Sequence, residues 1–90
     1  MREIRAIVTG KVQGVSFRDF VSASAQKLGV NGYVRNLPDG TVQVMAQAGQ
    51  EELNAFLDIL HTGPPLSRVE AVRIEWREPS NMYPVFQIEY

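Results

Sequence analysis

The order in which two kinds of hydrophobic periodicity follow one another is the feature of this sequence that most constrains its fold. Alternation of apolar and polar residues predicts strands at residues 2–9, 32–36, 41–48, 69–77 and 86–90. Apolar residues spaced three and four apart predict helices at residues 17–28 and about 50–61. This strand-helix-strand-strand-helix-strand order, with one short strand added at its C-terminal end, is that of a ferredoxin-like split β-α-β sandwich. We expect an α+β protein in which two helices cover one face of an antiparallel sheet.

Turn-forming residues support this division of the chain. Gly29 follows the first helical pattern and is expected to end it in a left-handed conformation, and Gly63 with two prolines ends the second. The sequence Leu37-Pro38-Asp39-Gly40 predicts a tight turn between two strands. In the second of these strands we expect one face to pack on the helices and the other, carrying Gln43, Met45 and Gln47, to meet water.

Composition places the chain among small globular proteins. Ninety residues, of which 44% are hydrophobic and 21% charged, fit one domain spanning residues 1–90. The absence of cysteine excludes disulfides, a thiolate nucleophile and cysteine-bound metals. No apolar run has the length of a membrane span, and the first residues lack the apolar core of a signal peptide. We therefore expect a cytoplasmic protein that does not associate with membranes.

Charge is distributed unevenly along the chain. Residues 1–40 carry six Lys and Arg against three Asp and Glu, whereas the remainder carries three against seven, and the net charge is -1. A protein that binds nucleic acid by neutralising phosphates needs a larger basic excess. The strand face with Gln43, Met45 and Gln47 also lacks the exposed aromatic residues of a single-stranded RNA binder. The distribution favours a small anion over a polyanion, so we expect no nucleic-acid partner, and an RNA-binding domain of the same topology is the less favoured alternative.

The segment GKVQGVSFR, residues 10–18, joins the first predicted strand to the first helix. Amide groups at a helix start attract anions, and glycine allows the backbone to approach a ligand closely. Arg18 adds a planar fork of donors that matches a phosphate group. These features indicate a cradle for an oxyanion, most plausibly a phosphoryl group, although many strand-to-helix turns with glycine bind nothing. The segment matches neither the P-loop nor the dinucleotide-binding pattern.

The expected topology brings Asn36 toward this cradle, because the first strand and the hairpin that contains Asn36 are neighbours. A carboxamide can both donate to and accept from a water molecule, so Asn36 could hold a nucleophilic water beside the anion. The alternative is that Asn36 merely initiates the Pro-Asp-Gly turn. Arg35 is expected on the opposite face of its strand, and Lys11 is expected to add positive potential.

Other candidates for catalysis are weaker. His61, the only histidine, lies in the last turn of the second predicted helix, where a local structural role is expected. Ser16 has no evident base that could activate it as a nucleophile, and Asp19 is expected to face outward. The acidic residues do not converge with a histidine, so no metal site is predicted.

Two stretches together resemble the acylphosphatase family. GKVQGVSFR is similar to its first signature, Gly-x-Val-Gln-Gly-Val-x-Phe-Arg, and GYVRNLPDGTVQVMAQAG, residues 32–49, is similar to its second. The Gly-Pro-Pro segment at residues 63–65, the strand that follows it and residues 86–88 also resemble the family. The resemblance covers almost the whole chain.

The resemblance implies hydrolysis of the carboxyl-phosphate bond of small acyl phosphates to a carboxylate and inorganic phosphate, without metal or cofactor. It implies that Arg18 binds the phosphate and that Asn36 orients the attacking water. The remaining implied phosphate-binding positions, through their backbone amides, are Gln13, Gly14, Val15, Ser16 and Phe17. We expect a monomer. The rival interpretation, a domain of this family that only holds an anion, requires that acyl phosphates are not hydrolysed.

Overall fold

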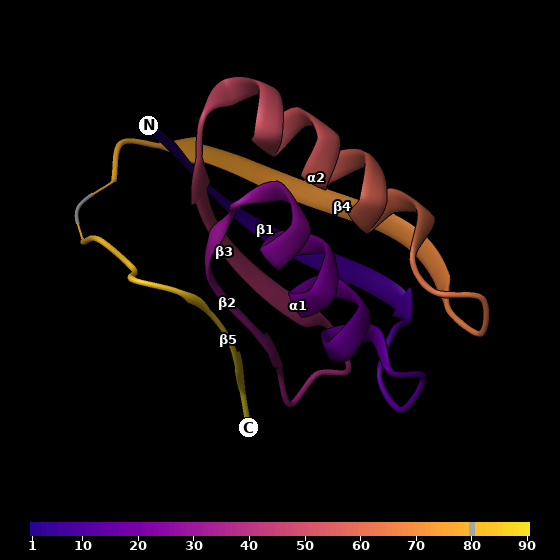
Figure 1. Ribbon diagram of the computed structural model, residues 1–90. Helices are drawn as coiled ribbons and strands as arrows, with labels where there is room; N and C mark the ends of the chain where they lie inside the picture. Colours follow the sequence, from indigo (N-terminus) through magenta and orange to yellow (C-terminus); the bar gives the residue numbers. More distant parts are fainter. Residues whose placement is uncertain (80) are drawn as a thin grey trace.

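The computed structural model describes residues 1–79 and 81–90, and it contains five strands and two helices in these ranges (Figure 1). In chain order they are β1 (Arg2–Lys11), α1 (Phe17–Leu28), β2 (Asn31–Asn36), β3 (Val42–Ala48), α2 (Gln50–Thr62), β4 (Arg68–Arg77) and β5 (Phe86–Glu89). The expected α+β, ferredoxin-like order is confirmed, and each element lies within two residues of its predicted bounds.

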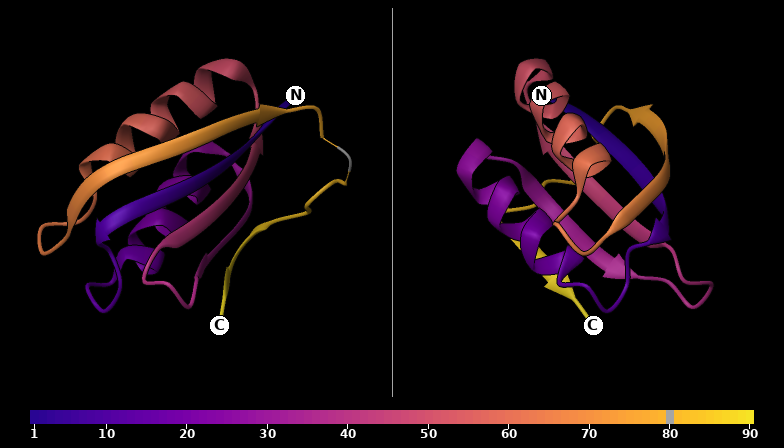
Figure 2. Two further views of the ribbon diagram at one scale, coloured as in Figure 1. Left: turned by 180° about the vertical axis from the view of Figure 1, so that it is seen from behind. Right: turned by 90° about the vertical axis from the view of Figure 1, so that its right-hand side faces the viewer.

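The strands form one sheet in the order β4-β1-β3-β2-β5. β1 pairs with β3 and β4, and β2 pairs with β3, all antiparallel. The sheet is antiparallel, as expected, except at one edge, where β5 runs parallel to β2. β4 ends beside the start of β1, so the chain crosses that end of the sheet and enters β5 in the same direction as β2 (Figures 1 and 2).

Both helices cover the same face of the sheet (Figure 2). The core between the layers is formed by alternate residues of the strands and by the apolar stripes of the helices. Its fully buried members include Ile4, Ala6, Val8, Val34, Val42 and Val44 from the strands and Val21, Ala25, Leu53, Phe56 and Leu60 from the helices. Gly29 ends α1 with φ 72° and ψ 30°, as its position predicted.

The second face of β3 does not meet water, contrary to expectation. Gln43, Met45 and Gln47 are 5%, 7% and 1% exposed. β3 is the central strand, so the side chains of β1 and β2 flank it on both sides. Gln47 also accepts a hydrogen bond from the Tyr83 amide at 3.1 Å, which places the segment before β5 across this face. The alternation in β3 therefore separates an apolar face in the core from a more polar face that is also covered.

Within the described residues, no helix is both long enough and apolar enough to cross a membrane.

Candidate active site

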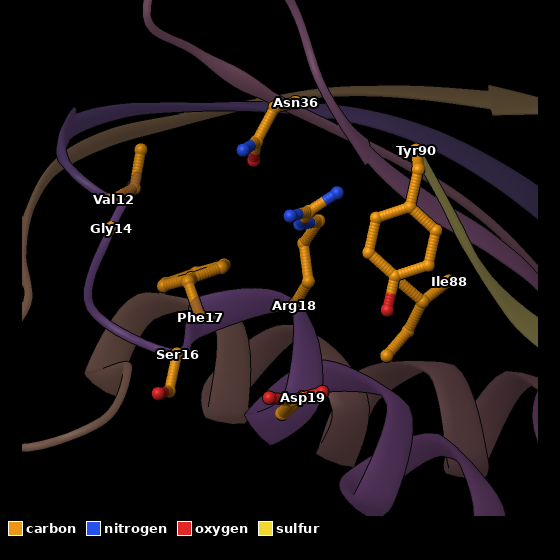
Figure 3. Close-up of a pocket in the computed structure, with 9 residues that line it drawn as sticks. All are labelled: Val12, Gly14, Ser16, Phe17, Arg18, Asp19, Asn36, Ile88 and Tyr90. Atoms are coloured by element: carbon orange, nitrogen blue, oxygen red, sulfur yellow. The ribbon is translucent and has the colours of Figure 1, made fainter.

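A cavity of about 180 Å³ lies where the loop after β1, the first turn of α1 and the ends of β2 and β5 meet (Figure 3). It is lined by Val12, Gly14, Ser16, Phe17, Arg18, Asp19, Asn36, Ile88 and Tyr90. The lining therefore joins residues from both halves of the chain on the helix-covered face of the sheet. Arg18 and Asn36, which the sequence predicted to converge, both belong to it.

Arg18 reaches this cavity from the first turn of α1 and is half-buried. Its Nη1 donates a hydrogen bond of 3.0 Å to the carbonyl oxygen of Glu89, and its Cζ lies 4.7 Å from the centre of the Tyr90 ring. The guanidinium extends from the helix toward Asn36 (Figure 3). A guanidinium has five N–H donors, so the bond to Glu89 leaves donors free for an anion in the cavity.

Asn36 stands at the end of β2 on the face that meets the helices. Its Oδ1 is buried and has no hydrogen-bond partner among the described residues. Most buried polar atoms are paired, so an unpaired amide oxygen on a side chain that lines the cavity indicates a place for a ligand or a water molecule. This arrangement disfavours the alternative in which Asn36 serves the turn.

The turn is stabilised by Asp39 instead. The backbone N–H and the hydroxyl of Thr41 donate to Asp39 Oδ1 at 3.0 and 2.6 Å. These hydrogen bonds, first that of the hydroxyl and then that of the amide, lower the pKa of Asp39 from its ordinary value of 3.8. Asn36 is thereby free of a structural duty in the turn.

The two glycines of the residue 10–18 segment serve different purposes. Gly14 has φ 73°, and Ser16, just before α1, has φ 61° and ψ 28°, a left-handed conformation that is uncommon for a residue other than glycine. Left-handed residues close together in a loop can turn backbone amides toward a common point, as an anion cradle requires. Gly10, the first residue of the predicted cradle segment, does not line the cavity. It has φ 123° and lies in an irregular step of the β1–β4 pairing, where a Cβ would overlap the Arg68 carbonyl oxygen.

Gln13 ties the loop to the β2–β3 hairpin. Its Nε2 donates to the carbonyl oxygens of Leu37 at 2.9 Å and Thr41 at 2.8 Å. Neither Gln13 nor Val15 lines the cavity, and Val15 is packed against the core. Of the six predicted phosphate-binding positions, the structure places Gly14, Ser16, Phe17 and Arg18 in the lining.

Three apolar or aromatic residues of the lining were not predicted from the sequence: Val12, Ile88 and Tyr90. Ile88 pairs with Val34 in the parallel β2–β5 register, so one further step of two residues places Tyr90 beside Asn36. The register therefore carries the signal that identifies Tyr90. Using this register requires knowing that β5 pairs with β2, and the periodicity of a five-residue segment does not reveal its partner strand.

The other titratable candidates have local surroundings. Nδ1 of His61 lies 2.8 Å from the Leu57 carbonyl oxygen within α2, which fits the expected local role. Asp19 is exposed, although it contributes to the lining. Residues 1–79 and 81–90 contain no group of three or more His, Cys, Asp or Glu placed to hold a metal ion.

Comparison with known proteins identifies the family of the chain. A model of the acylphosphatase family matches residues 4–88. Acylphosphatases of Thermococcus kodakarensis and Thermus thermophilus are each 46% identical to the chain, over 91% of its length and over 92% and 93% of theirs. The crystal structure of acylphosphatase from Bacillus subtilis superposes with a TM-score of 0.97 at 34% identity, covering 100% of both chains. The chain therefore belongs to the acylphosphatase family and is an enzyme of that family.

Proposed function

We propose that this enzyme hydrolyses the carboxyl-phosphate bond of small acyl phosphates, with Arg18 and loop amides binding the phosphate and Asn36 orienting the attacking water. The observation that carries the proposal is the meeting of Arg18 and the unpaired, buried Oδ1 of Asn36 in one cavity (Figure 3). One group suits an anion and the other suits a water molecule, and hydrolysis of a phosphate compound needs both.

Phosphate binding is assigned to the segment from Gln13 to Arg18. The fork of Arg18 can donate two parallel hydrogen bonds to phosphate oxygens. The left-handed backbone at Gly14 and Ser16 and the start of α1 favour amides directed at the same anion. Gln13 and Val15 would bind the phosphate only through their backbone amides, because the Gln13 side chain bonds the Leu37 carbonyl oxygen and Val15 packs against the core.

In the proposed reaction, the water oxygen held by Asn36 forms a bond to phosphorus as the bond from phosphorus to the acyl oxygen breaks. The carboxylate leaves with the bonding electron pair, and a water proton passes to a phosphate oxygen. An acyl phosphate dianion and water thus give a carboxylate and dihydrogen phosphate. A carboxylate is a good leaving group, so the site needs no general acid, and positioning with charge stabilisation supplies the catalysis.

The proposal requires no cofactor, metal ion, nucleic acid or membrane, and it takes the enzyme to be a cytoplasmic monomer. The cavity of about 180 Å³ suits a small substrate. Its apolar lining, Val12, Phe17, Ile88 and Tyr90, offers contacts for an acyl group beside the polar groups that meet the phosphate.

The test is a benzoyl phosphate assay in the presence of a chelator, with the wild type, Arg18→Ala and Asn36→Ala. Arg18→Ala should lower the rate roughly 10³- to 10⁵-fold, the range for a positioned arginine in phosphoryl transfer. Asn36→Ala should lower kcat strongly while inorganic phosphate still inhibits with nearly the wild-type constant. A folded wild-type chain that binds phosphate without hydrolysing benzoyl phosphate would establish the anion-binding alternative and refute the proposal.

A further inference from the structure

We infer that Tyr90 is a positioning residue for Arg18: its ring holds the guanidinium in the orientation that binds the phosphoryl group. The inference rests on the phosphate-binding role proposed for Arg18. The contact between Arg18 and Tyr90 supports it, because Cζ of Arg18 lies 4.7 Å from the centre of the ring. A cation at that distance is attracted by the negative face of an aromatic ring.

Two contacts together restrain the Arg18 side chain. The hydrogen bond from Nη1 to the Glu89 carbonyl oxygen, 3.0 Å long, fixes one edge of the planar guanidinium. The Tyr90 ring lies on another side of the same group. In the view of Figure 3, Arg18 stands between this ring and the loop that contains Gly14. The ring therefore backs the guanidinium, and the loop and Asn36 are left on the side open to an anion.

The sheet explains why Tyr90 is in this position. β5 pairs in parallel with β2, with Val34 opposite Ile88 and Arg35 opposite Glu89. The next step of this register sets Tyr90 opposite Asn36, on the face of the sheet that α1 covers. The strand pairing that holds Asn36 at the cavity thus also delivers the backbone carbonyl and the ring that restrain Arg18.

Restraint of this kind should raise affinity. An arginine side chain has many rotamers, and the entropy lost when the ligand orders it makes binding less favourable. A guanidinium that is already oriented avoids that loss. Tyr90 is 97% exposed, so its ring contributes little to the core, and its removal should be detected at Arg18 rather than in the stability of the fold.

A series of variants at position 90 tests the inference by titration with inorganic phosphate. Tyr90→Phe keeps the ring and should retain wild-type affinity. Tyr90→Leu removes the ring and should raise the Kd for phosphate about two- to fivefold, the effect of an exposed cation–ring contact. Phenylalanines of increasing fluorination at position 90 should raise the Kd stepwise, because fluorine withdraws charge from the ring face. Urea denaturation should give the same stability throughout the series.

Tyr33→Leu is the matched control. The Tyr33 ring lies 5.5 Å from Cζ of Arg35, and neither residue lines the cavity. Loss of this second cation–ring pair should leave the Kd for phosphate unchanged.

Three results would overturn the inference: equal Kd values for Tyr90→Leu and wild type, no trend with fluorination, or tighter binding in Tyr90→Leu. If Arg18→Ala still loses phosphate binding in those cases, the proposed function survives and only the role of Tyr90 is refuted. If Arg18→Ala binds phosphate normally, the proposed function fails first.

Discussion

At the scale of single residues, Asn36 and Asp39 have different roles at the turn after β2, although a sequence pattern gives either one as a turn-forming residue. Asp39 accepts two hydrogen bonds from Thr41, whereas Oδ1 of Asn36 has no partner among the described residues. Because the turn is already stabilised by Asp39, the carboxamide of Asn36 can face the cavity. This division of roles frees Asn36 for a ligand without weakening the hairpin.

Ionisation of Asp39 should make the hairpin sensitive to pH. Because folding lowers its pKa from 3.8, Asp39 stabilises the fold above that pH, and the contribution is lost as the pH falls through the folded value. Asp39→Asn keeps the acceptor but not the charge. The difference in unfolding free energy between wild type and Asp39→Asn should therefore shrink between neutral pH and a pH well below 3.8. Urea denaturation at both pH values measures it, and a constant difference would contradict the assignment.

Alanine substitutions at Gly14 and Gly32 should distinguish the cost of a left-handed backbone from the cost of steric overlap with a neighbouring strand. Gly14 has φ 73° and open space around it, so Gly14→Ala should cost about 1–2 kcal/mol from the left-handed conformation alone. Gly32 has φ 146°, and a Cβ there would overlap the Met45 carbonyl oxygen, forcing β2 away from β3. Gly32→Ala should therefore destabilise at least about twice as much as Gly14→Ala in thermal or urea unfolding. Equal losses would show that the sheet accommodates the methyl group.

At the scale of elements, periodicity predicted all seven helices and strands of the described chain. Six of them contribute buried residues to a common core, and β4 packs the partly buried Val69 and Val72 against it. Periodicity also predicted that Arg18 and Asn36 come together, since the topology makes β1 and β3 neighbours. It could not predict that Gln43 and Gln47 are buried. A glutamine face is equally compatible with water and with partners such as Arg35 and Glu3, and those partners depend on the register.

The clamp between the loop and the hairpin yields a prediction at this scale. Gln13→Glu keeps the shape of the side chain but removes both donors to the Leu37 and Thr41 carbonyl oxygens. Each carbonyl also accepts a backbone N–H, so loss of the two hydrogen bonds alone should cost about 1–3 kcal/mol of unfolding free energy. Repulsion between the new carboxylate and the two carbonyl oxygens should add to this loss. The Kd for phosphate should rise as well, since the clamp fixes the loop relative to Asn36.

Gln26→Ala is the control for Gln13→Glu, because Gln26 is exposed in α1 and remote from the hairpin. Its unfolding free energy and Kd for phosphate should match the wild type. A Gln13→Glu enzyme with wild-type values for both would mean that the loop holds its shape without the clamp.

At the scale of the whole molecule, the segment between β4 and β5 connects opposite edges of the sheet (Figure 1). Gln47 anchors it, because its amide donates to the Asn81 carbonyl oxygen and accepts from the Tyr83 amide. The same side chain donates to buried Glu3 at 2.8 Å, and Glu3 pairs with Arg77 at 3.2 Å. One buried glutamine thus joins β1, β3, β4 and the segment that leads β5 to Arg18.

Replacement of Gln47 should therefore act at a distance. Gln47→Leu fills the same space but leaves the Tyr83 amide unpaired and Glu3 with Arg77 as its remaining side-chain partner among the described residues. We expect a loss of about 2–5 kcal/mol, as for other buried groups that lose their partners.

The matched variant, Gln43→Leu, is equally buried on the same face but gives up one hydrogen bond to the exposed Arg35, so it should cost about 1 kcal/mol. The distant effect can be measured at the amide of Gly32, which donates to the Val85 carbonyl oxygen at 3.0 Å. In Gln47→Leu its hydrogen exchange should accelerate, and the Kd for phosphate should rise because β5 delivers Glu89 and Tyr90 to Arg18. Unchanged exchange at Gly32 in a destabilised Gln47→Leu enzyme would show that β5 holds its place by strand pairing alone.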